Sequence, residues 1–317
     1  MAIDETSRKA PTAASPELLQ ELLEETSRTF ALAIPMLPQP VRGEVTIAYL
    51  LFRIADTFED ATVLWSRAER SEALRGLAGI LETPEPAERA VPLVGRWRSR
   101  PPIDHSGYLR LLELTPDVLA SLGALEGGAR DVVRHHTVRT ALGMAEFVDR
   151  TGEDGVLRLT DLADLRAYCY VVAGIVGEML TDLFLLSVPA LQSIGDRLRT
   201  RAALFGEGLQ LTNILKDSAW DHVEGRNFVP PAIDRAEVFA LARRDLEAAE
   251  EYCLALQEAG APSGLVAFTA LTVGLAEPTL SKVEAHGPGS KISRARVALV
   301  HQRIRRALAA GRPVFER

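Results

Sequence analysis

Two short acidic segments carry the residue types best suited to chemistry in this sequence. In the first, LFRIADTFED (51–60), Asp56 and Asp60 are four residues apart and Glu59 adjoins the second of them. On a helix, positions i and i+4 share a face, so the two aspartates would project side by side. Such a pair repels itself, and a partly buried pair needs a cation to compensate the repulsion.

The second segment, QLTNILKDSAWDHVEGR (210–226), repeats this spacing. Asp217 and Asp221 are four residues apart, and Asn213 lies four residues before Asp217. Mg²⁺ prefers oxygen ligands and usually binds one or two carboxylates together with substrate phosphates. Two such helices that face each other could therefore hold a metal-bridged diphosphate between them.

Basic residues accompany both acidic segments. Arg53 lies one turn before Asp56, Lys216 precedes Asp217, and Arg226 follows the second segment. Each could meet a phosphate oxygen of a departing diphosphate. The alternative is that each acidic stripe is only a solvated helix face, as charge runs usually are. The apolar flanks AYLLF and GLQLTNIL favour the rim of a core, but the pattern alone leaves both interpretations open.

A third segment, RAYCYVVAGIVGEML (166–180), is apolar and contains Tyr168, Tyr170, Gly174 and Gly177. A glycine inside a helix costs about 1 kcal/mol relative to alanine, so the two glycines need a reason. Close helix packing is one explanation. The other is room for a long apolar ligand to which the tyrosines present hydroxyls or ring faces.

These segments must be positioned by helices, because apolar residues recur at intervals of three and four and period-2 alternation is nearly absent. Proline- and glycine-rich breaks separate about eight to ten expected helices. The pattern contains no long flexible linker and no repeat of 20 to 50 residues. We therefore predict an all-α protein with a flexible tail at 1–15 and a single helical domain at 16–317.

Composition limits the classes of function. The net charge of −7 and the pI near 5.5 argue against nucleic-acid binding. Cys169 and Cys253 are far apart and form no metal-binding or disulfide pattern, which favours a reducing, cytoplasmic setting. The span 170–190 approaches membrane length, but Glu178 and Asp182 interrupt it, so we predict a buried core helix.

Together the segments resemble the squalene/phytoene synthase family from about Ser27 to Val300. The motifs that carry the resemblance stand in the family's order: SRTFALAIPMLP, AYLLFRIADTFED, LGMAEFVDR, YCYVVAGIVGEML and LQLTNILKDSAWDHVEGRNFVP. The Asp-Thr-Phe-Glu-Asp form of the first acidic motif and the GMAEF segment resemble the squalene type more than the phytoene type. GSKISRARVALV loosely resembles the squalene-type segment associated with NADPH. The sequence departs from the family at Lys216, where arginine is common, and at Trp220, which replaces a usual acid.

The resemblance implies an isoprenoid-synthase helical bundle around a central cavity, Mg²⁺ and NADPH as cofactors, and a prenyl diphosphate substrate. It implies that two farnesyl diphosphates condense head to head to presqualene diphosphate, which NADPH reduces to squalene. The implied metal ligands are Asp56, Glu59, Asp60, Asp217 and Asp221. The implied diphosphate-binding residues are Ser27, Arg28, Arg53, Gln210, Asn213, Lys216 and Arg226. Tyr168 would act beside the aspartates in catalysis, and Lys291 and Arg294 would bind the cofactor.

Alternatives remain at the level of the product and of activity. A related synthase could form phytoene, or stop at presqualene diphosphate or dehydrosqualene without reduction. A non-catalytic assembly factor of the same fold is a further alternative. We expect a cytoplasmic protein, monomeric and without nucleic-acid partners, that contacts the inner face of the membrane peripherally to release its product.

Overall fold

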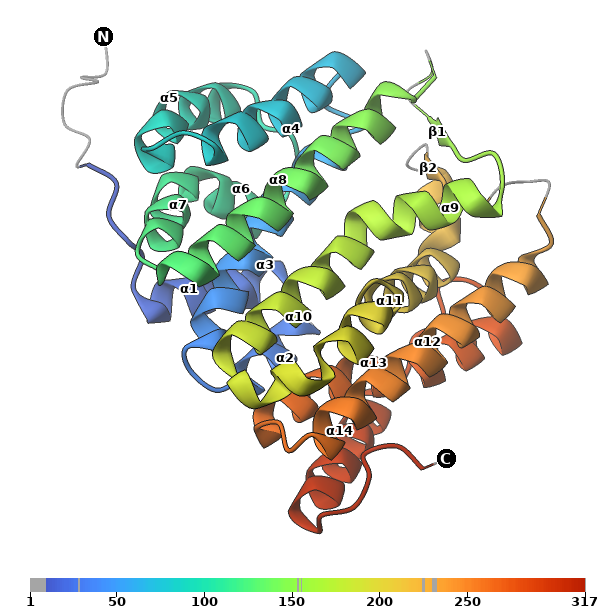
Figure 1. Ribbon diagram of the computed structural model, residues 1–317. Helices are drawn as coiled ribbons and strands as arrows, with labels where there is room; N and C mark the ends of the chain where they lie inside the picture. The colour runs from blue at the N-terminus through green and yellow to red at the C-terminus, as the bar shows by residue number, and fades with distance from the viewer. Residues whose placement is uncertain are drawn as a thin grey trace, which may run out of the picture.

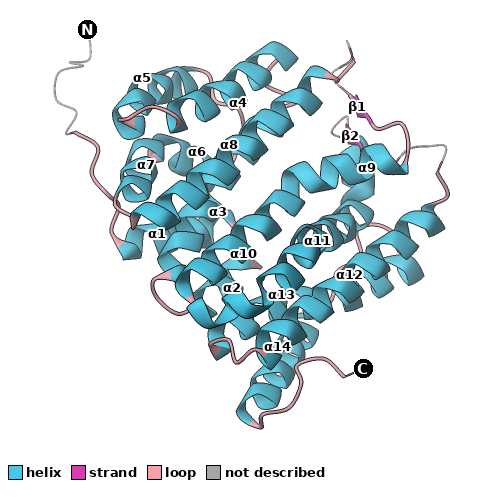
Figure 2. Ribbon diagram, in the orientation of Figure 1, coloured by secondary structure: helices cyan, strands magenta, loops and turns pink. Residues whose placement is uncertain are grey.

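The computed structural model describes residues 10–27, 29–152, 154, 156–223, 226–229 and 233–316, without the side chains of 219–223, 226 and 227. Within these residues the fold is helical, and the only strands are two-residue β1 and β2 (Figure 2). The elements are α1 (Pro16–Thr26), α2 (Phe30–Ala33), η2 (Ile34–Met36), α3 (Val41–Glu59), α4 (Arg67–Leu81), α5 (Pro86–Ser99), α6 (Ser106–Glu113), α7 (Thr115–Gly123), α8 (Gly127–Asp149), β1 (Leu157–Arg158), α9 (Leu162–Cys169), η3 (Tyr170–Gly174), α10 (Ile175–Ser187), η4 (Pro189–Ile194), α11 (Gly195–Val223), β2 (Arg226–Asn227), α12 (Arg235–Glu258), α13 (Ser263–His286) and α14 (Arg294–Ala309).

The prediction of an all-α protein is confirmed, but eight to ten helices was too few, because fourteen α-helices lie in the described part of the chain. The undercount comes from short helices joined without a glycine-rich break. Pro116 stands in the first turn of α7, where a missing N–H costs nothing, so a new helix begins immediately after α6.

The helices form a layered bundle in which α8, α9 with α10, α11 and α12 run in similar directions across the face shown in Figure 1. Helices α4 and α5 lie at one end of the bundle, and α13 and α14 lie at the other. The first helix, α1, and the last helix, α14, are well separated in this view.

Helix α3, which carries the first acidic segment, is the central element of the core. Its apolar residues Leu50, Leu51 and Ile54 are fully buried, and in its second half only Arg53 and Asp56 are partly exposed. A second hydrophobic cluster joins α9, α11 and α12 around Tyr168 and Leu211. The two acidic segments therefore rise from two different parts of the core.

Helices α10 and α11 approach each other closely through glycines. A Cβ on Gly177 would lie 1.9 Å from the carbonyl oxygen of Ala202, and one on Gly206 would lie 1.9 Å from that of Ala173. Only glycine fits such a contact, so close packing explains Gly177. Room for a ligand is not needed to account for it.

The segment before α1 contacts the body of the protein. Ala14 N–H donates to Ser121 Oγ at 2.9 Å, and Ser15 caps α1 by accepting from Leu18 N–H at 3.2 Å. Residues 1–9 of the predicted tail lie outside the described residues, and the mobility of the tail stays a prediction.

Candidate active site

The first acidic segment ends α3, and Asp56 within it forms an ion pair with Arg53. Asp56 Oδ2 lies 3.2 Å from Arg53 NH1, with 31% of the aspartate side chain exposed. Asp60 follows as the C-cap residue, and its N–H donates to the carbonyl oxygen of Asp56 at 2.8 Å. Asp60 therefore continues the helical turn, with the spacing that the sequence predicts.

Arg53 is the centre of a hydrogen-bonded chain that reaches α1. Its Nε and NH2 donate to the hydroxyl of Tyr49 at 3.2 and 3.0 Å, and this hydroxyl donates to the carbonyl oxygen of Thr26 at 3.0 Å. Burial alone would lower the pKa of Arg53, but the charge of Asp56 and the hydroxyls of Tyr49 and Tyr108 hold it above its ordinary value. Arg53 thus stays a cation in a partly dry site.

The same chain brings in Ser27, which adjoins Thr26 at the end of α1. The Ser27 hydroxyl accepts a hydrogen bond from Phe30 N–H at 3.0 Å and so orders the turn into α2. Arg28, predicted to bind diphosphate, lies outside the described residues.

Glu59 differs from the two aspartates because it is buried, with only 9% of the residue exposed. It lines a cavity of about 10 Å³ together with Arg70 and Phe228. Arg70 NH1 also donates to the Glu59 carbonyl oxygen at 2.9 Å, which fixes the end of α3 on α4. As a metal ligand, Glu59 would have to act from this enclosed position.

The second acidic segment lies in the last part of α11. Lys216 Nζ contacts Asn213 Oδ1 at 3.1 Å and Asp217 Oδ2 at 3.2 Å, so these three predicted residues form one cluster. Gln210 is half-buried one turn earlier on the same helix. Asp221 lies in α11 and Arg226 in β2, but their side chains are outside the described residues.

Phe228 connects the segment after α11 to the end of α3. It lines the small cavity with Glu59, and its ring stacks on the ring of Tyr168 at 4.7 Å between centroids. Phe147 of α8 meets the same tyrosine edge-on at 5.2 Å. Strand β2, which contains Arg226, pairs in parallel with β1. The chain after the second acidic segment therefore lies beside the first.

Tyr168 and Tyr170 have different environments although they are two residues apart. Tyr168 is buried in an aromatic and aliphatic cluster, with 4% exposed. Tyr170 begins a π-helical turn, and its hydroxyl donates to Glu178 at 3.0 Å and accepts from Arg139 at 2.6 Å. Tyr170 is thus held in a polar network with α8.

Both predicted cofactor residues follow α13, Lys291 in a loop that reaches α11 and Arg294 at the start of α14. Lys291 and Arg294 are exposed. Lys282 Nζ donates to the Lys291 carbonyl oxygen at 2.8 Å, and Gly289 N–H donates to the Lys216 carbonyl oxygen at 2.7 Å. The loop is thereby tied to the helix of the second acidic segment.

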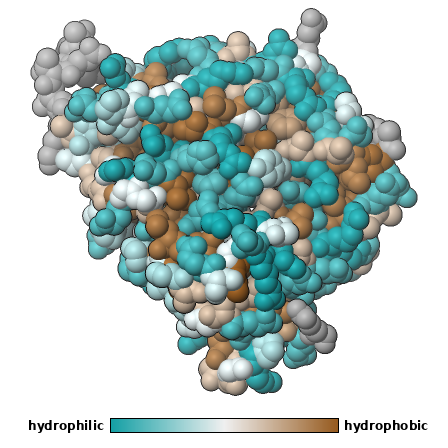
Figure 3. All heavy atoms as spheres, viewed as in Figure 1, coloured by the Kyte–Doolittle hydropathy of each residue, from teal (hydrophilic) through white to brown (hydrophobic). Residues whose placement is uncertain are grey.

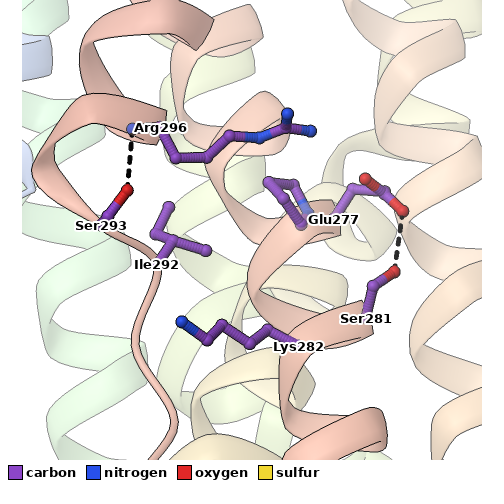
Figure 4. Close-up of a pocket in the computed structure, with 7 residues that line it drawn as sticks. Glu277, Ser281, Lys282, Ile292, Ser293 and Arg296 are labelled. Carbon is purple, nitrogen blue, oxygen red and sulfur yellow. Dashed lines mark hydrogen bonds between the residues drawn. The ribbon is translucent and has the colours of Figure 1, made fainter.

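A cavity of about 440 Å³ lies beside this loop, between α13 and the start of α14. Figure 4 shows Lys282 and Arg296 on opposite sides of Ile292, and the Glu277 carboxylate turned toward Ser281, whose hydroxyl donates to it at 3.0 Å. Ser293 caps α14 by accepting from Arg296 N–H at 3.2 Å. The basic residues that line this cavity are Lys282 and Arg296, which the sequence did not single out. The predicted residues Lys291 and Arg294 are not part of the lining.

Among the described side chains, no three His, Cys, Asp or Glu groups are placed to enclose a metal ion. Asp221 lies outside that set. The two acidic segments thus form separate carboxylate clusters, and a basic side chain pairs with each of them, Arg53 with Asp56 and Lys216 with Asp217.

The sequence profile of the squalene/phytoene synthase family matches residues 23–236, which is more than half of the chain. The chain belongs to this family. The matched range contains both acidic segments, Tyr49, Tyr108 and Tyr168.

The chain is similar to several squalene synthases. The chain is 30% identical over 211 residues to a probable squalene synthase of Neurospora crassa, covering 67% of the chain and 41% of the relative. It is 31% identical over 228 residues to the squalene synthase of Saccharomyces cerevisiae, covering 69% of the chain and 47% of the relative. The chain thus spans less than half the length of these relatives.

Solved structures show the same fold. One described as TcSQS with the ligand BPH1237 superposes with a TM-score of 0.67 at 25% identity, covering 91% of this chain and 85% of the other. A dehydrosqualene synthase in complex with ligand superposes with a TM-score of 0.55 at 20% identity, covering 93% and 96%. The second likeness concerns the fold alone.

Two continuous helical segments have the length and apolar composition of a membrane span, 162–187 and 263–286. In each, more than half of the most apolar window is buried inside the protein. The core-helix interpretation of the first segment agrees with this burial. The surface in Figure 3 shows hydrophobic patches interrupted by hydrophilic side chains on the face viewed.

Proposed function

We propose that this protein condenses two farnesyl diphosphates head to head to presqualene diphosphate and reduces this product with NADPH to squalene. The observation that carries the proposal is the arrangement around α3. Asp56 and Asp60 end this helix beside the half-buried Arg53, and Phe228, which follows the second acidic segment, lines a small cavity with Glu59 and stacks on Tyr168.

The residues fit Mg²⁺ and a diphosphate. Mg²⁺ commonly takes only one or two carboxylates from a protein and completes its shell with water and phosphate oxygens, so separate acidic clusters suit it. Asp56 and Asp60 would bind it from α3, and Asp217 and Asp221 would bind it from α11. When bound, the metal would neutralise charge on the departing diphosphate.

The cations of the two clusters would meet phosphate oxygens directly. Arg53 and Lys216 each form an ion pair with an aspartate. With Mg²⁺ bound to the aspartates, Arg53 and Lys216 would be available to donate charge-assisted hydrogen bonds to the diphosphate. Ser27, Arg28, Gln210, Asn213 and Arg226 would complete the diphosphate-binding set.

Tyr168 would face the allylic cation that remains after diphosphate departs. Its ring lies between Phe147 and Phe228, and these aromatic neighbours exclude water from one side of it. An aromatic face stabilises a nearby cation, and a dry site prevents its capture by water.

The basic groups near the α13–α14 loop fit the phosphates of NADPH. Lys282 and Arg296 line a cavity of about 440 Å³, Lys291 stands on the adjoining loop, and Arg294 begins α14. Lysine can contact phosphate as a point charge, and arginine can bind it in a bidentate manner. NADPH would supply the hydride for the reductive step.

We further propose a peripheral contact with the membrane, beside the first acidic segment. Val63 and Leu64 follow Asp60 closely and are 83% and 45% exposed. A C30 hydrocarbon is insoluble in water, so an apolar loop near its site of formation would assist its transfer to lipid. In a vesicle flotation assay, Val63→Ser with Leu64→Ser should reduce binding, whereas Leu299→Ser, also at an exposed leucine, should not.

One incubation series tests the reaction. The protein is given farnesyl diphosphate with Mg²⁺, with and without NADPH carrying a deuterium label, and the products are identified by mass spectrometry. We expect labelled squalene with NADPH and presqualene diphosphate or its diversion products without it. Equal C30 product without NADPH would move the assignment to a dehydrosqualene-type synthase, and preference for geranylgeranyl diphosphate would move it to phytoene.

The cofactor assignment has its own variants. Lys291→Ala and Arg294→Ala should raise the NADPH concentration needed for half-maximal squalene formation while sparing presqualene diphosphate formation. Arg305→Ala is the matched control, because Arg305 is an exposed arginine on α14 about three turns beyond Arg294. An equal effect of all three changes would contradict the assignment.

A further inference from the structure

Tyr108 is an aromatic residue outside both acidic segments whose ring meets the guanidinium of Arg53. The Arg53 Cζ atom lies 5.6 Å from the centre of the Tyr108 ring and 5.4 Å from the centre of the Tyr49 ring. Both distances are within the range of cation–π attraction. Two rings from two helices therefore contact one cation.

The position of Tyr108 is set by contacts between α6 and α1 that do not involve Arg53. A Cβ on Gly107 would lie 2.9 Å from the carbonyl oxygen of Glu25, so the glycine allows the two backbones to approach closely. Arg110 then bridges Glu21 at 2.9 Å and Glu25 at 2.5 Å. These contacts fix the first turn of α6, and with it Tyr108, against the end of α1.

The surroundings of Tyr108 are those of the first acidic segment. Burial raises the pKa of its hydroxyl, Arg53 opposes this rise, and Tyr49, Asp56 and Asp60 add to it. The ring thus stays neutral near pH 7 and within electrostatic reach of both aspartates. Its other contact is with His105, whose ring centre lies 4.5 Å away on the exposed side of α6.

We propose that Tyr108 is a positioning residue that acts through Arg53. Together with Tyr49 it restrains the guanidinium of Arg53. Arg53 can then leave Asp56 and bind a phosphate oxygen without a further loss of side-chain entropy. A free arginine side chain loses considerable rotamer entropy when it is fixed, and a restrained one has lost it before the ligand arrives. This inference rests on the proposed diphosphate chemistry of the same site.

The test is a double-mutant cycle between Tyr108 and Arg53, read on the dissociation constant of inorganic pyrophosphate in the presence of Mg²⁺ by calorimetry. Tyr108→Leu should weaken binding about tenfold, the factor expected when the entropy of one arginine side chain has to be supplied at binding. Tyr108→Phe should weaken it less than about threefold, because the ring remains. In the Arg53→Ala background, Tyr108→Leu should have no further effect.

Turnover of farnesyl diphosphate provides a second measurement. Tyr108→Leu should raise KM by more than it lowers kcat, since the residue acts on binding through Arg53. His105→Ala is the matched control, because it removes the ring on the other side of Tyr108 and should leave pyrophosphate affinity unchanged. If Tyr108→Leu does not fold, Tyr108→Gln also lacks the ring and replaces it in the cycle.

The outcomes separate this inference from the proposed function. Additive losses from Tyr108→Leu and Arg53→Ala would overturn the positioning role, even if squalene is formed. Failure of the wild-type protein to bind Mg²⁺–pyrophosphate would also overturn it. Coupled losses in pyrophosphate binding without any C30 product would support the positioning role and refute the proposed reaction.

Discussion

The peptide N–H of Gly289 donates a hydrogen bond of 2.7 Å to the carbonyl oxygen of Lys216. This contact joins the loop that carries Lys291 to the helix that carries Asp217, although the two segments are more than 70 residues apart in sequence. Gly289 has φ +82°, a conformation that other residues adopt only at a cost. This glycine therefore helps to hold the loop of the predicted cofactor site against the helix of the second acidic segment.

Replacing this glycine should disturb the cofactor step selectively. We expect Gly289→Val to cost about 1–2 kcal/mol of loop stability and to raise the NADPH requirement, with presqualene diphosphate formation retained. Gly260→Val is the matched control, because Gly260 has φ +72° and lies in the turn before α13. Thermal unfolding and cofactor titration of both variants check this expectation, and an equal change in NADPH requirement would contradict it.

Asp56→Asn and Asp217→Asn should each abolish most turnover and change stability little. Both aspartates are partly exposed and form ion pairs of 3.2 Å, which contribute about 0–1 kcal/mol. Loss of a metal ligand should lower kcat by about 100-fold or more, by analogy with the removal of one oxyanion donor. Asp154→Asn, which breaks an exposed ion pair with Arg158, serves as the control for charge alone. Wild-type rates in the first two variants would end the metal assignment.

Tyr168 should tolerate phenylalanine structurally and alanine poorly. Tyr168→Phe keeps the stacking on Phe228 and the edge contact with Phe147, whereas Tyr168→Ala removes a buried ring at a cost of about 3–5 kcal/mol. Denaturant unfolding measures both. If the hydroxyl takes part in proton transfer, Tyr168→Phe lowers turnover at nearly unchanged stability. Full turnover in this variant would show that the role of Tyr168 belongs to its ring and not to its hydroxyl.

Asp245 should make stability depend on pH between about 4 and 6. Burial raises its pKa to about 6 against the lowering effects of Arg166 and Arg244, and nearby Glu207 is also buried with a raised pKa. The folded state therefore binds a proton that the unfolded state releases near pH 4, so this contribution to stability is present below pH 4 and lost as pH rises through 6.

The matching variant is Asp245→Asn, which cannot ionise. It should be more stable than the wild type at pH 7.5, by on the order of 2–3 kcal/mol, and should flatten the pH profile between 4 and 6. Unfolding free energies measured from pH 4 to pH 8 test this. A wild-type slope that persists in Asp245→Asn would assign the dependence to other groups.

The α10–α11 contact should not accept a methyl group. Gly177→Ala would place a Cβ 1.9 Å from a carbonyl oxygen, and we expect a loss of several kcal/mol, about 3 or more, because backbone has to move. Gly76→Ala, in an open position on α4, should instead gain about 0.5–1 kcal/mol. Equal melting temperatures for the two variants would refute this reading of the contact.

Sequence periodicity predicted the helical class and placed the first acidic pair on one helix, because these features depend on local spacing. Tyr49 could have been found in the same way, since it precedes Arg53 by four residues and shares its face. Its role does not follow from the sequence, because a tyrosine in an apolar helix has the pattern of a buried core residue. The acceptor of its hydroxyl, the Thr26 carbonyl oxygen, belongs to another element and leaves no sequence pattern.

Tyr108, Phe228 and Arg296 could not be predicted from spacing. Tyr108 meets Arg53 only because α6 docks on α1, and Phe228 lines a cavity with Glu59 only because the chain returns to α3 after α11. Such contacts depend on tertiary packing. Likewise, the two explanations offered for Gly177 could be separated only when the backbone of Ala202 was seen beside it.

The π-helical turn at Tyr170–Gly174 has a consequence for how this chain can vary. A π turn accommodates one more residue than an α turn, so it behaves as a single-residue insertion stored inside a helix. Deleting either Val171 or Val172 would let α9 and α10 become one regular helix. The side chains on its two halves would then rotate relative to each other, which would separate the aromatic setting of Tyr168 from the glycine contact at Gly177. The π turn therefore lets Tyr168 pack in its aromatic cluster while Gly177 packs against α11. A regular helix through the same residues could not make both contacts.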